Sequence, residues 1–197
     1  MTLILVRHGE SEGNARGVIT GSLDLDLTDL GWEQARRVGA RLADYPVAAI
    51  YSSTLQRAAN TGAAVAAYHE FEVEQLAGLD EYRYGEAEGL AWAEIMERFD
   101  LMTRDWGKGV VPGEEGYLVF RGRVAETIDV LRERHREEVA VVACHGGTII
   151  QALGHILELP DHGSPRTQIA NCSVTIIEHR GGRDEIAVIN DVCHLAN

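Results

Sequence analysis

The sequence predicts an α/β fold, a three-layer sandwich in which a mostly parallel central sheet is covered by helices on both faces. Short apolar segments such as Leu3–Val6 are typical of strands buried on both sides of a parallel sheet. These segments alternate along the chain with stretches of helical character, which is the pattern of α/β proteins. The chain has 197 residues, enough to bury a sizeable core, and contains no repeat or Pro/Gly/Ser-rich linker. We therefore expect a single domain over residues 1–197.

The first half of the chain contains two strand–helix pairs. After the strand Leu3–Val6, the stretch "LTDLGWEQARRVGARLADY" predicts an amphipathic helix with Thr28 as its N-cap. The expected apolar face of this helix is Leu30, Gln34, Val38 and Leu42. "VAAIYSS" predicts a second strand, and the alanine-rich "TLQRAANTGAAVAAY" predicts a helix with Ser52 or Ser53 as its cap.

The second half of the chain continues the alternation. A long helix is expected to end near Glu137, and its apolar face is Tyr117, Phe120, Val124, Ile128 and Leu131. "VAVVACHGG" predicts a third buried strand, followed by a helix in "TIIQALGHILEL". "CSVTIIEH" and "EIAVIN" predict two closing strands joined by a turn at Gly181-Gly182.

Composition and charge exclude several classes of protein. The net charge of −13 argues against a nucleic-acid partner, because nucleic-acid binding requires clustered Lys and Arg. No apolar run approaches the roughly 20 residues that span a bilayer, and "MTLILV" lacks the basic region of a signal peptide. The cysteines, Cys144, Cys172 and Cys193, are scattered without CxxC spacing, so we expect reduced thiols in a cytoplasmic protein. A homodimer remains open.

Histidines and arginines follow the predicted strands at the edge where an α/β sheet binds ligands. The first strand ends in Arg7-His8-Gly9, and the "VAVVAC" strand ends in His145-Gly146-Gly147. Arg57 lies early in the helix after the second strand, where a cation opposes the helix dipole unless an anion is bound there. Each histidine alone is more often a structural group, and Arg7 alone could belong to a salt bridge. Together they indicate a site for a doubly negative group such as a phosphoryl group.

A signature and four further motifs in the expected order make the sequence similar to the histidine phosphatase superfamily, which includes cofactor-dependent phosphoglycerate mutases and many small-molecule phosphatases. "LVRHGESEGN" resembles its signature, and "GSLDLDLTDLGWEQA" resembles the stretch that follows. "IYSSTLQRAANT" resembles the block that carries an arginine, "LDEYRYGEAEG" the block that carries the catalytic acid, and "ACHGGTI" the block of the second histidine. The resemblance covers almost the whole chain.

The resemblance implies a role for each of the main site residues. His8 would be the nucleophile that forms a phosphohistidine, its tautomer fixed by a backbone carbonyl. Arg7, Arg57 and His145 would surround the transferring phosphoryl group. Glu81 would protonate the leaving oxygen and then activate water. From charge alone, Glu81 could equally be one of several solvated loop carboxylates.

The resemblance also implies further contacts to the phosphoryl group and the substrate. These residues are Asn14, Thr20, Gly21 and Gly146. Such a cradle can transfer a phosphoryl group by positioning and electrostatics alone, so no metal and no cofactor is expected.

The choice between phosphatase and mutase depends on departures from the mutase pattern. The mutases have an arginine directly after the catalytic glutamate, whereas here Tyr82 intervenes before Arg83. The chain is also too short before the second histidine block for the mutase lid, and an open site favours hydrolysis. We therefore predict a phosphatase acting on a small phosphomonoester, with a phosphoglycerate mutase as the alternative and an inactive binding module as a remote one. Specificity is expected in Ser22, Leu23, Tyr82–Tyr84 and residues 100–117.

Overall fold

A six-stranded mixed sheet forms the centre of the protein. The computed structural model describes residues 1–99, 109–160, 165 and 167–196. The strands follow the order β3-β2-β4-β1-β5-β6 across the sheet. The first four in this order are parallel, and β5 and β6 are antiparallel additions at one edge. The strands are β1 (Thr2–Arg7), β2 (Val47–Ser52), β3 (Val73–Gln75), β4 (Val139–Cys144), β5 (Val174–Arg180) and β6 (Arg183–Asp191).

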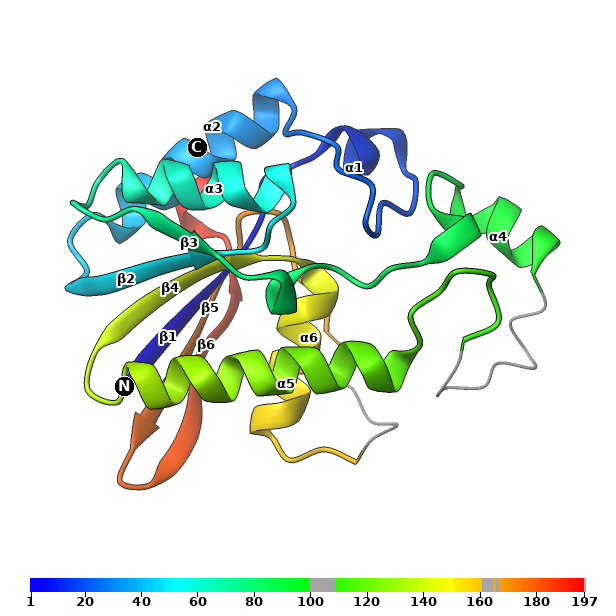
Figure 1. The fold of residues 1–197 in the computed structure, drawn as a ribbon. Coiled ribbons are helices and arrows are strands. Elements are labelled where there is room, and N and C mark those ends of the chain that lie inside the picture. Colours follow the sequence, from blue (N-terminus) through cyan, green and yellow to red (C-terminus); the bar gives the residue numbers. More distant parts are fainter. Residues whose placement is uncertain (100–108, 161–164, 166, 197) are drawn as a thin grey trace.

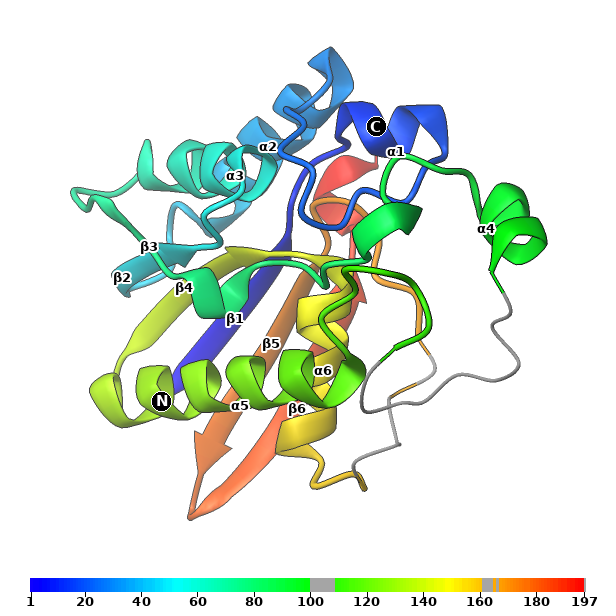
Figure 2. The same ribbon diagram turned by 45° about the vertical axis from the view of Figure 1, so that its right-hand side comes forward.

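Helices cover both faces of this sheet, as Figures 1 and 2 show. One face carries α2 (Asp29–Leu42) and α3 (Gln56–Ala66), and the other carries α5 (Tyr117–Arg134) and α6 (Gly146–Ile156). The short helices α1 (Glu12–Arg16) and α4 (Trp92–Arg98) lie beyond the end to which the parallel strands point. The predicted α/β sandwich is confirmed.

A hydrophobic core lies on each face of the sheet, and this explains why a central strand such as β1 is apolar without interruption. Side chains alternate between the two faces of a strand. In β1, Leu3 and Leu5 pack in the core with α5 and α6, whereas Ile4 and Val6 pack in the core with α2 and α3. All four are 0% exposed, and burying each such side chain stabilises the fold by about 1.5–3 kcal/mol.

The predicted apolar face of α2 is partly wrong. Thr28 is the N-cap as predicted, and its hydroxyl accepts a hydrogen bond from Gly31 N–H at 3.0 Å. Leu30, however, is 52% exposed. The reason is a close approach at Gly31, where an added Cβ would lie 2.0 Å from the carbonyl oxygen of Glu10. This contact places Gly31 against the rest of the molecule and leaves Leu30 on the solvent side; the buried face is Gly31, Ala35, Val38, Gly39 and Leu42.

The predicted serine cap of α3 is also wrong. The N-cap residue is Leu55, without a side-chain cap. Ser53 does accept a hydrogen bond from Leu55 N–H, but it lies before the helix and has other partners, described below. In place of a local cap, Asp24 accepts from the N–H of Gln56, the first residue of the helix, and Asp80 accepts from Thr54 N–H in the loop before it.

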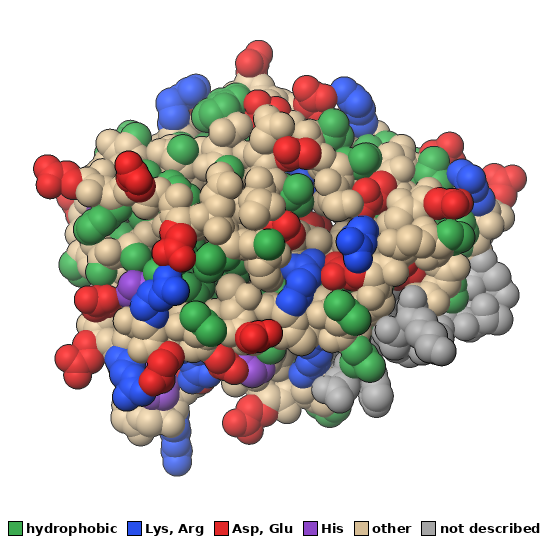
Figure 3. Space-filling view, in the orientation of Figure 1, with side chains coloured by type: hydrophobic (Ala, Val, Ile, Leu, Met, Phe, Trp, Pro, Cys, Tyr) green, Lys and Arg blue, Asp and Glu red, His purple; other side chains and the backbone are tan. Residues whose placement is uncertain are grey.

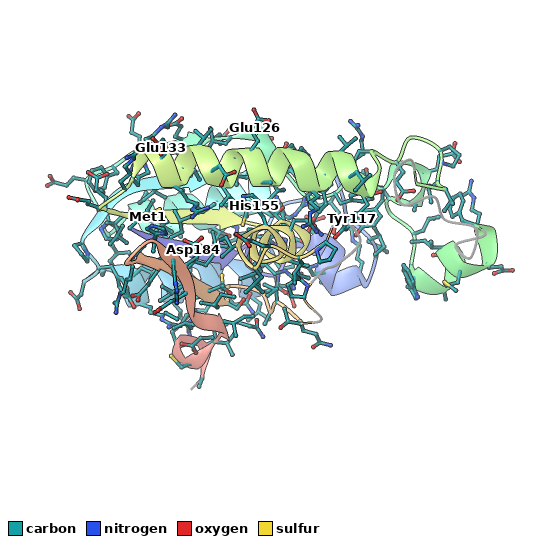
Figure 4. The ribbon with its side chains drawn as sticks, turned by 90° about the horizontal axis from the view of Figure 1, so that it is seen from below. Met1, Tyr117, Glu126, Glu133, His155 and Asp184 are labelled. Carbon is teal, nitrogen blue, oxygen red and sulfur yellow. The ribbon has the colours of Figure 1, made fainter. Side chains whose placement is uncertain are left out.

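The helix α5 runs along the sheet with its polar side outward. In Figure 4, Glu126 and Glu133 point away from the sheet, and Tyr117 lies at the start of the helix. Acidic side chains, with basic ones among them, are spread over the face seen in Figure 3. Within the described ranges, no helix is both long and apolar enough to cross a membrane.

Candidate active site

The site lies where three neighbouring parallel strands end. Arg7 ends β1 opposite Cys144 of β4, and Ser52 of β2 pairs with Ala143. The residues that follow, His8, His145 and Ser53, therefore come together at one edge of the sheet. This is the edge at which α/β sheets bind ligands.

His8 is a buried, neutral histidine with a defined tautomer. Its side chain is 4% exposed, and Nδ1 lies 2.7 Å from the carbonyl oxygen of Gly9. Because a carbonyl only accepts, the proton is on Nδ1 and the lone pair is on Nε2. Burial, and then the charges of Arg7 and Arg57, hold the pKa of His8 well below its usual value. The ring is therefore neutral, and its backbone partner is of the kind that the family resemblance implied.

Two arginines are buried beside this histidine. Arg57 is 1% exposed and donates to the carbonyl oxygens of Leu23 and Gly21, each at 2.7 Å. Arg7 donates to the carbonyl oxygen of Ile169. The Nε atoms of both arginines are buried without a partner among the described residues. Burial lowers the pKa of both guanidinium groups, and Glu81 opposes this shift more than any other charge. Arginine stays charged in such a place because its intrinsic pKa is so high.

His145 lies beside His8 at the same edge of the sheet. It is 0% exposed, and its ring centroid lies 5.1 Å from that of His8 in an edge-on arrangement. Its Nε2 lies 2.8 Å from the Ser53 hydroxyl oxygen. Burial is the main cause of a pKa far below the usual value, and His8, Arg57 and Arg7 contribute in the same direction.

Glu81 lies against the start of α6, where a glycine makes room for it. Its Oε2 accepts a hydrogen bond from Gly147 N–H at 3.0 Å. An added Cβ on Gly147 would lie 2.2 Å from Glu81 Oε1, so a side chain here would displace the carboxylate. The neighbouring Asp80 is occupied by Ser53 and Thr54. Of the carboxylates in this loop, Glu81 is thus the one that lines the cavity.

Arg123 of α5 holds the loop that carries Glu81 by hydrogen bonds. Its guanidinium donates to the carbonyl oxygens of Gly78, Asp80 and Glu81 at 3.2, 2.7 and 2.9 Å. It also pairs with Glu115 at 2.8 Å, whose side chain is only 6% exposed. Neither residue was identified from the sequence as part of the site, although Glu115 lies within residues 100–117, the region expected to determine specificity.

Gly146, Gly21 and Thr20 take part in the site in different ways. Gly146 is the first residue of α6, where an added Cβ would lie 3.6 Å from Arg7 Nε. Gly21 contacts the site through its carbonyl oxygen, which accepts from Arg57. Thr20 shares this loop, in which its carbonyl oxygen accepts from Leu23 N–H.

Asn14 is linked to the site through another side chain. Its Oδ1 accepts from Ser11 N–H and from the amide of Asn171, which also donates to the carbonyl oxygen of His8 at 3.0 Å. Asn171 lies far from the motifs in sequence, so no local pattern indicated it.

A cavity of about 490 Å³ opens beside Arg7 and Glu81. It is also lined by Gly146 and Gly147 and by residues 167–170 with Asn190. The sequence did not predict the part of the lining formed by residues 167–170 and Asn190. Of the region expected to determine specificity, residues 100–108 lie outside the described residues. No group of three His, Cys, Asp or Glu side chains that could hold a metal ion occurs in the part of the chain that the structure describes.

The geometry agrees with comparisons to known proteins. Residues 3–192 match the family model of the histidine phosphatase superfamily (branch 1). The chain is 30% identical over 203 residues to the metal-independent phosphoserine phosphatase of Arabidopsis thaliana, covering 99% of this chain and 83% of that protein.

Two solved structures share the fold over nearly the whole length. Bacillus stearothermophilus YhfR has a TM-score of 0.88 and 32% identity, with 99% of both chains covered. A mutant phosphoserine phosphatase from Entamoeba histolytica, in complex with phosphoserine, has a TM-score of 0.85 and 27% identity, again with 99% of both chains covered. The predicted family is confirmed, and with it a phosphatase of the histidine type. The chain belongs to branch 1 of the histidine phosphatase superfamily.

Proposed function

We propose that this protein hydrolyses a small phosphomonoester through a phosphohistidine formed on His8. The observation that carries the proposal is the state of the His8 ring, which is buried, neutral and protonated on Nδ1 beside two buried arginines. A neutral Nε2 with a free lone pair is what attack on phosphorus requires. Arg7, Arg57 and His145 offset the charge of the phosphoryl oxygens, so positioning and electrostatics supply the catalysis.

Two chemical steps follow from this arrangement. In the first, the Nε2 lone pair of His8 bonds to phosphorus while the bond from phosphorus to the leaving oxygen breaks, and Glu81 gives that oxygen a proton. In the second, Glu81 takes a proton from water as the water oxygen bonds to phosphorus. The P–N bond then breaks, and its electron pair returns to Nε2.

One feature of the site favours hydrolysis over the mutase reaction. The position directly after Glu81 is Tyr82, which is 4% exposed and packs against Tyr84 and Phe120. Its hydroxyl donates to Glu114. In the mutases that the sequence resembles, an arginine at this position helps to hold the substrate carboxylate. A buried tyrosine offers no cation for that purpose.

The substrate class is a small phosphomonoester, and phosphoserine is the first compound to test. The similar protein of Arabidopsis thaliana bears the name of a phosphoserine phosphatase, and the similar Entamoeba structure holds phosphoserine. We further propose that the enzyme acts in the cytoplasm without a metal ion, a cofactor or a nucleic-acid partner. A single domain and a homodimer remain predictions.

A labelling experiment tests the mechanism. Wild-type protein mixed with a ³²P-labelled phosphomonoester and quenched with base should retain acid-labile label, and His8→Ala should retain none and have no turnover. His155→Ala removes a histidine that pairs with Asp129 away from the site, and it should label like the wild type. Label on His8→Ala would refute the nucleophile. Loss of wild-type activity in EDTA, restored by a divalent ion, would instead indicate a metal-dependent phosphatase.

A substrate panel tests the reaction class. Phosphoserine, sugar phosphates and nucleotide-precursor phosphates should release inorganic phosphate. Isomerisation of 3-phosphoglycerate primed with 2,3-bisphosphoglycerate, faster than any hydrolysis, would favour the mutase.

A further inference from the structure

A chain of hydrogen bonds joins His145 to a carboxylate that the proposed reaction does not use. His145 Nε2 lies 2.8 Å from the hydroxyl oxygen of Ser53, and this hydroxyl donates to Asp80 Oδ1 at 2.7 Å. Ser53 and His145 are both 0% exposed. The chain thus connects the phosphoryl site to the loop that precedes Glu81.

The partners of Ser53 determine where its hydrogen lies. Asp80 also accepts from the backbone N–H and the hydroxyl of Thr54. Its carboxylate oxygen accepts from Ser53 as well, so the one hydrogen of the Ser53 hydroxyl points to Asp80. The oxygen of Ser53 can then only accept, from Leu55 N–H at 3.1 Å and from His145. Nε2 of His145 therefore carries a proton.

This assignment decides the state of the other ring nitrogen. A neutral ring with its proton on Nε2 has a lone pair on Nδ1. Nδ1 of His145 is buried and has no hydrogen-bond partner among the described residues. In this tautomer it cannot donate a hydrogen bond to a phosphoryl oxygen, which itself only accepts.

The charges around the ring keep it neutral until an anion arrives. Burial lowers the pKa of His145 most. The charged or titratable groups that lower it further are His8, Arg57, Arg7 and Arg123. The amino end of α6 acts in the same direction. On the negative side, Asp80 acts through Ser53, and the Glu81 carboxylate accepts from Gly147 N–H. A phosphoryl dianion would reverse this balance.

We propose that the phosphoryl group binds together with one proton held on Nδ1 of His145, and that Ser53 and Asp80 are the positioning residues that impose this. Nδ1 gains the proton, its lone pair forms the N–H bond, and the imidazolium then donates to a phosphoryl oxygen. The proton comes from water or from the monoanion of the ester, whose second pKa is about 6. The inference rests on the proposed function, because it requires a phosphoryl group at this site.

Nitrogen NMR of the histidine rings tests the proposal directly. In ¹⁵N-histidine-labelled protein at pH 7.5, where free inorganic phosphate is mostly dianionic, a His145→Gln variant identifies the His145 signals. We expect a neutral ring protonated on Nε2 without ligand, and an imidazolium with both nitrogens protonated at saturating phosphate. A proton on Nδ1 in the free protein, or a neutral ring with phosphate bound, would overturn the proposal.

Variants of Ser53 test whether its hydroxyl fixes the tautomer of His145, as distinct from a general disturbance of the loop. Ser53→Cys leaves a weak acceptor in nearly the same volume, so part of the free protein should carry the proton on Nδ1, and phosphate should bind with less proton uptake. Ser53→Thr keeps the hydroxyl and should behave as the wild type. Thr54→Ala removes another contact of Asp80 and should also preserve the wild-type tautomer. If Ser53→Cys were identical to the wild type, Ser53 would have no such role.

The same spectra distinguish failure of this inference from failure of the proposed function. If phosphate shifts the signals of His8 but leaves His145 neutral, the site binds phosphate and only the proton assignment is wrong. If millimolar phosphate shifts neither ring, both the inference and the proposed phosphoryl site are wrong.

Discussion

At the scale of single residues, Gly147 determines where the carboxylate of Glu81 can lie. The backbone N–H of Gly147 donates to Oε2, and a side chain on Gly147 would occupy the place of Oε1. The carboxylate is the end of a flexible side chain, so a methyl group would displace it at little cost in folding free energy. Gly147→Ala should therefore keep Glu81 in the protein but move its carboxylate out of place.

Gly147→Ala is expected to slow catalysis in a way that depends on the leaving group. An alkoxide must be protonated as it leaves, whereas p-nitrophenolate hardly needs a proton. The pre-steady-state burst with an alkyl phosphate should fall by roughly the 10²–10⁴-fold typical of lost general acid catalysis, and the burst with p-nitrophenyl phosphate should fall less. Equal slowing of both bursts would contradict the acid role of Glu81.

Gly122→Ala is the matched control for this variant. Gly122 is exposed within α5, and an added Cβ would meet no atom within 4 Å. Its rates should equal those of the wild type. Its free energy of unfolding should rise by about 0.5–1 kcal/mol, because alanine is the better helix former.

At the scale of elements, α5 supports the loop that carries Glu81, the proposed acid. Arg123 contributes three hydrogen bonds to backbone carbonyl oxygens of that loop and an ion pair to the buried Glu115. Glu115 in turn accepts from Arg83 N–H at 2.8 Å. The helix thereby fixes the backbone on both sides of Glu81, although it contributes no residue that would touch the phosphoryl group.

Arg123→Met should lower kcat more than it raises KM. Misplacement of a catalytic group by about 1 Å can cost about 10²-fold in rate, so we expect a fall of about 10–100-fold. Leaving Glu115 without its cation should also destabilise the fold by about 3 kcal/mol. Urea unfolding and steady-state kinetics measure the two effects.

A second substitution tells the two effects apart. Arg123→Met with Glu115→Gln removes the unpaired charge, so stability should recover while kcat stays low. Arg132→Met, at the far end of α5, breaks an ion pair to Asp184 and should leave kcat unchanged. Recovery of kcat together with stability would mean that Arg123 acts only through folding.

At the scale of the whole molecule, the protein buries two arginines beside two histidines inside a chain with a net charge of −13. The distant carboxylates are screened by salt, whereas the charges of Arg7 and Arg57 act at short range in a buried site. Burial and the arginines keep both His8 and His145 neutral in the folded state. Folding is therefore linked to pH.

The free energy of unfolding should fall as the pH drops below about 6.5, the ordinary histidine pKa. Below that pH the unfolded chain binds protons at both residues and the folded chain does not, so stability is lost toward acid pH. Each histidine should contribute about 1.4 kcal/mol per pH unit until its folded pKa is reached. His194 shifts in the same direction, whereas the lowered pKa values of Asp191 and Glu33 matter only at more acidic pH.

Urea unfolding at pH 7, 6 and 5 measures this slope. His8→Gln and His145→Gln should each reduce it by about 1.4 kcal/mol per pH unit. An unchanged slope in both variants would mean that the two histidines are protonated in the folded protein.

The sequence by itself determined the α/β class, the strand–helix order and the four motifs that place His8, Arg57, Glu81 and His145. These follow from local rules, since apolar runs form buried strands and the carboxyl ends of parallel strands share one edge. The exposed Leu30 and the missing serine cap of α3 escaped prediction, because the contacts at Gly31 and Asp80 join distant segments.

Only the tertiary structure decided how the site residues are supported. Three sets of hydrogen bonds support the site: those from Ser53 to Asp80 and His145, those from Arg123 to the loop before Glu81, and that from Asn171 to His8. They join residues 27 to 163 positions apart in the chain. Long-range hydrogen bonds of this kind leave no periodic pattern in a sequence, since each depends on the packing of whole elements. The motifs thus name the groups that we propose to do the chemistry, and the packing of β1, β2, β4 and α5 decides where each of these groups lies.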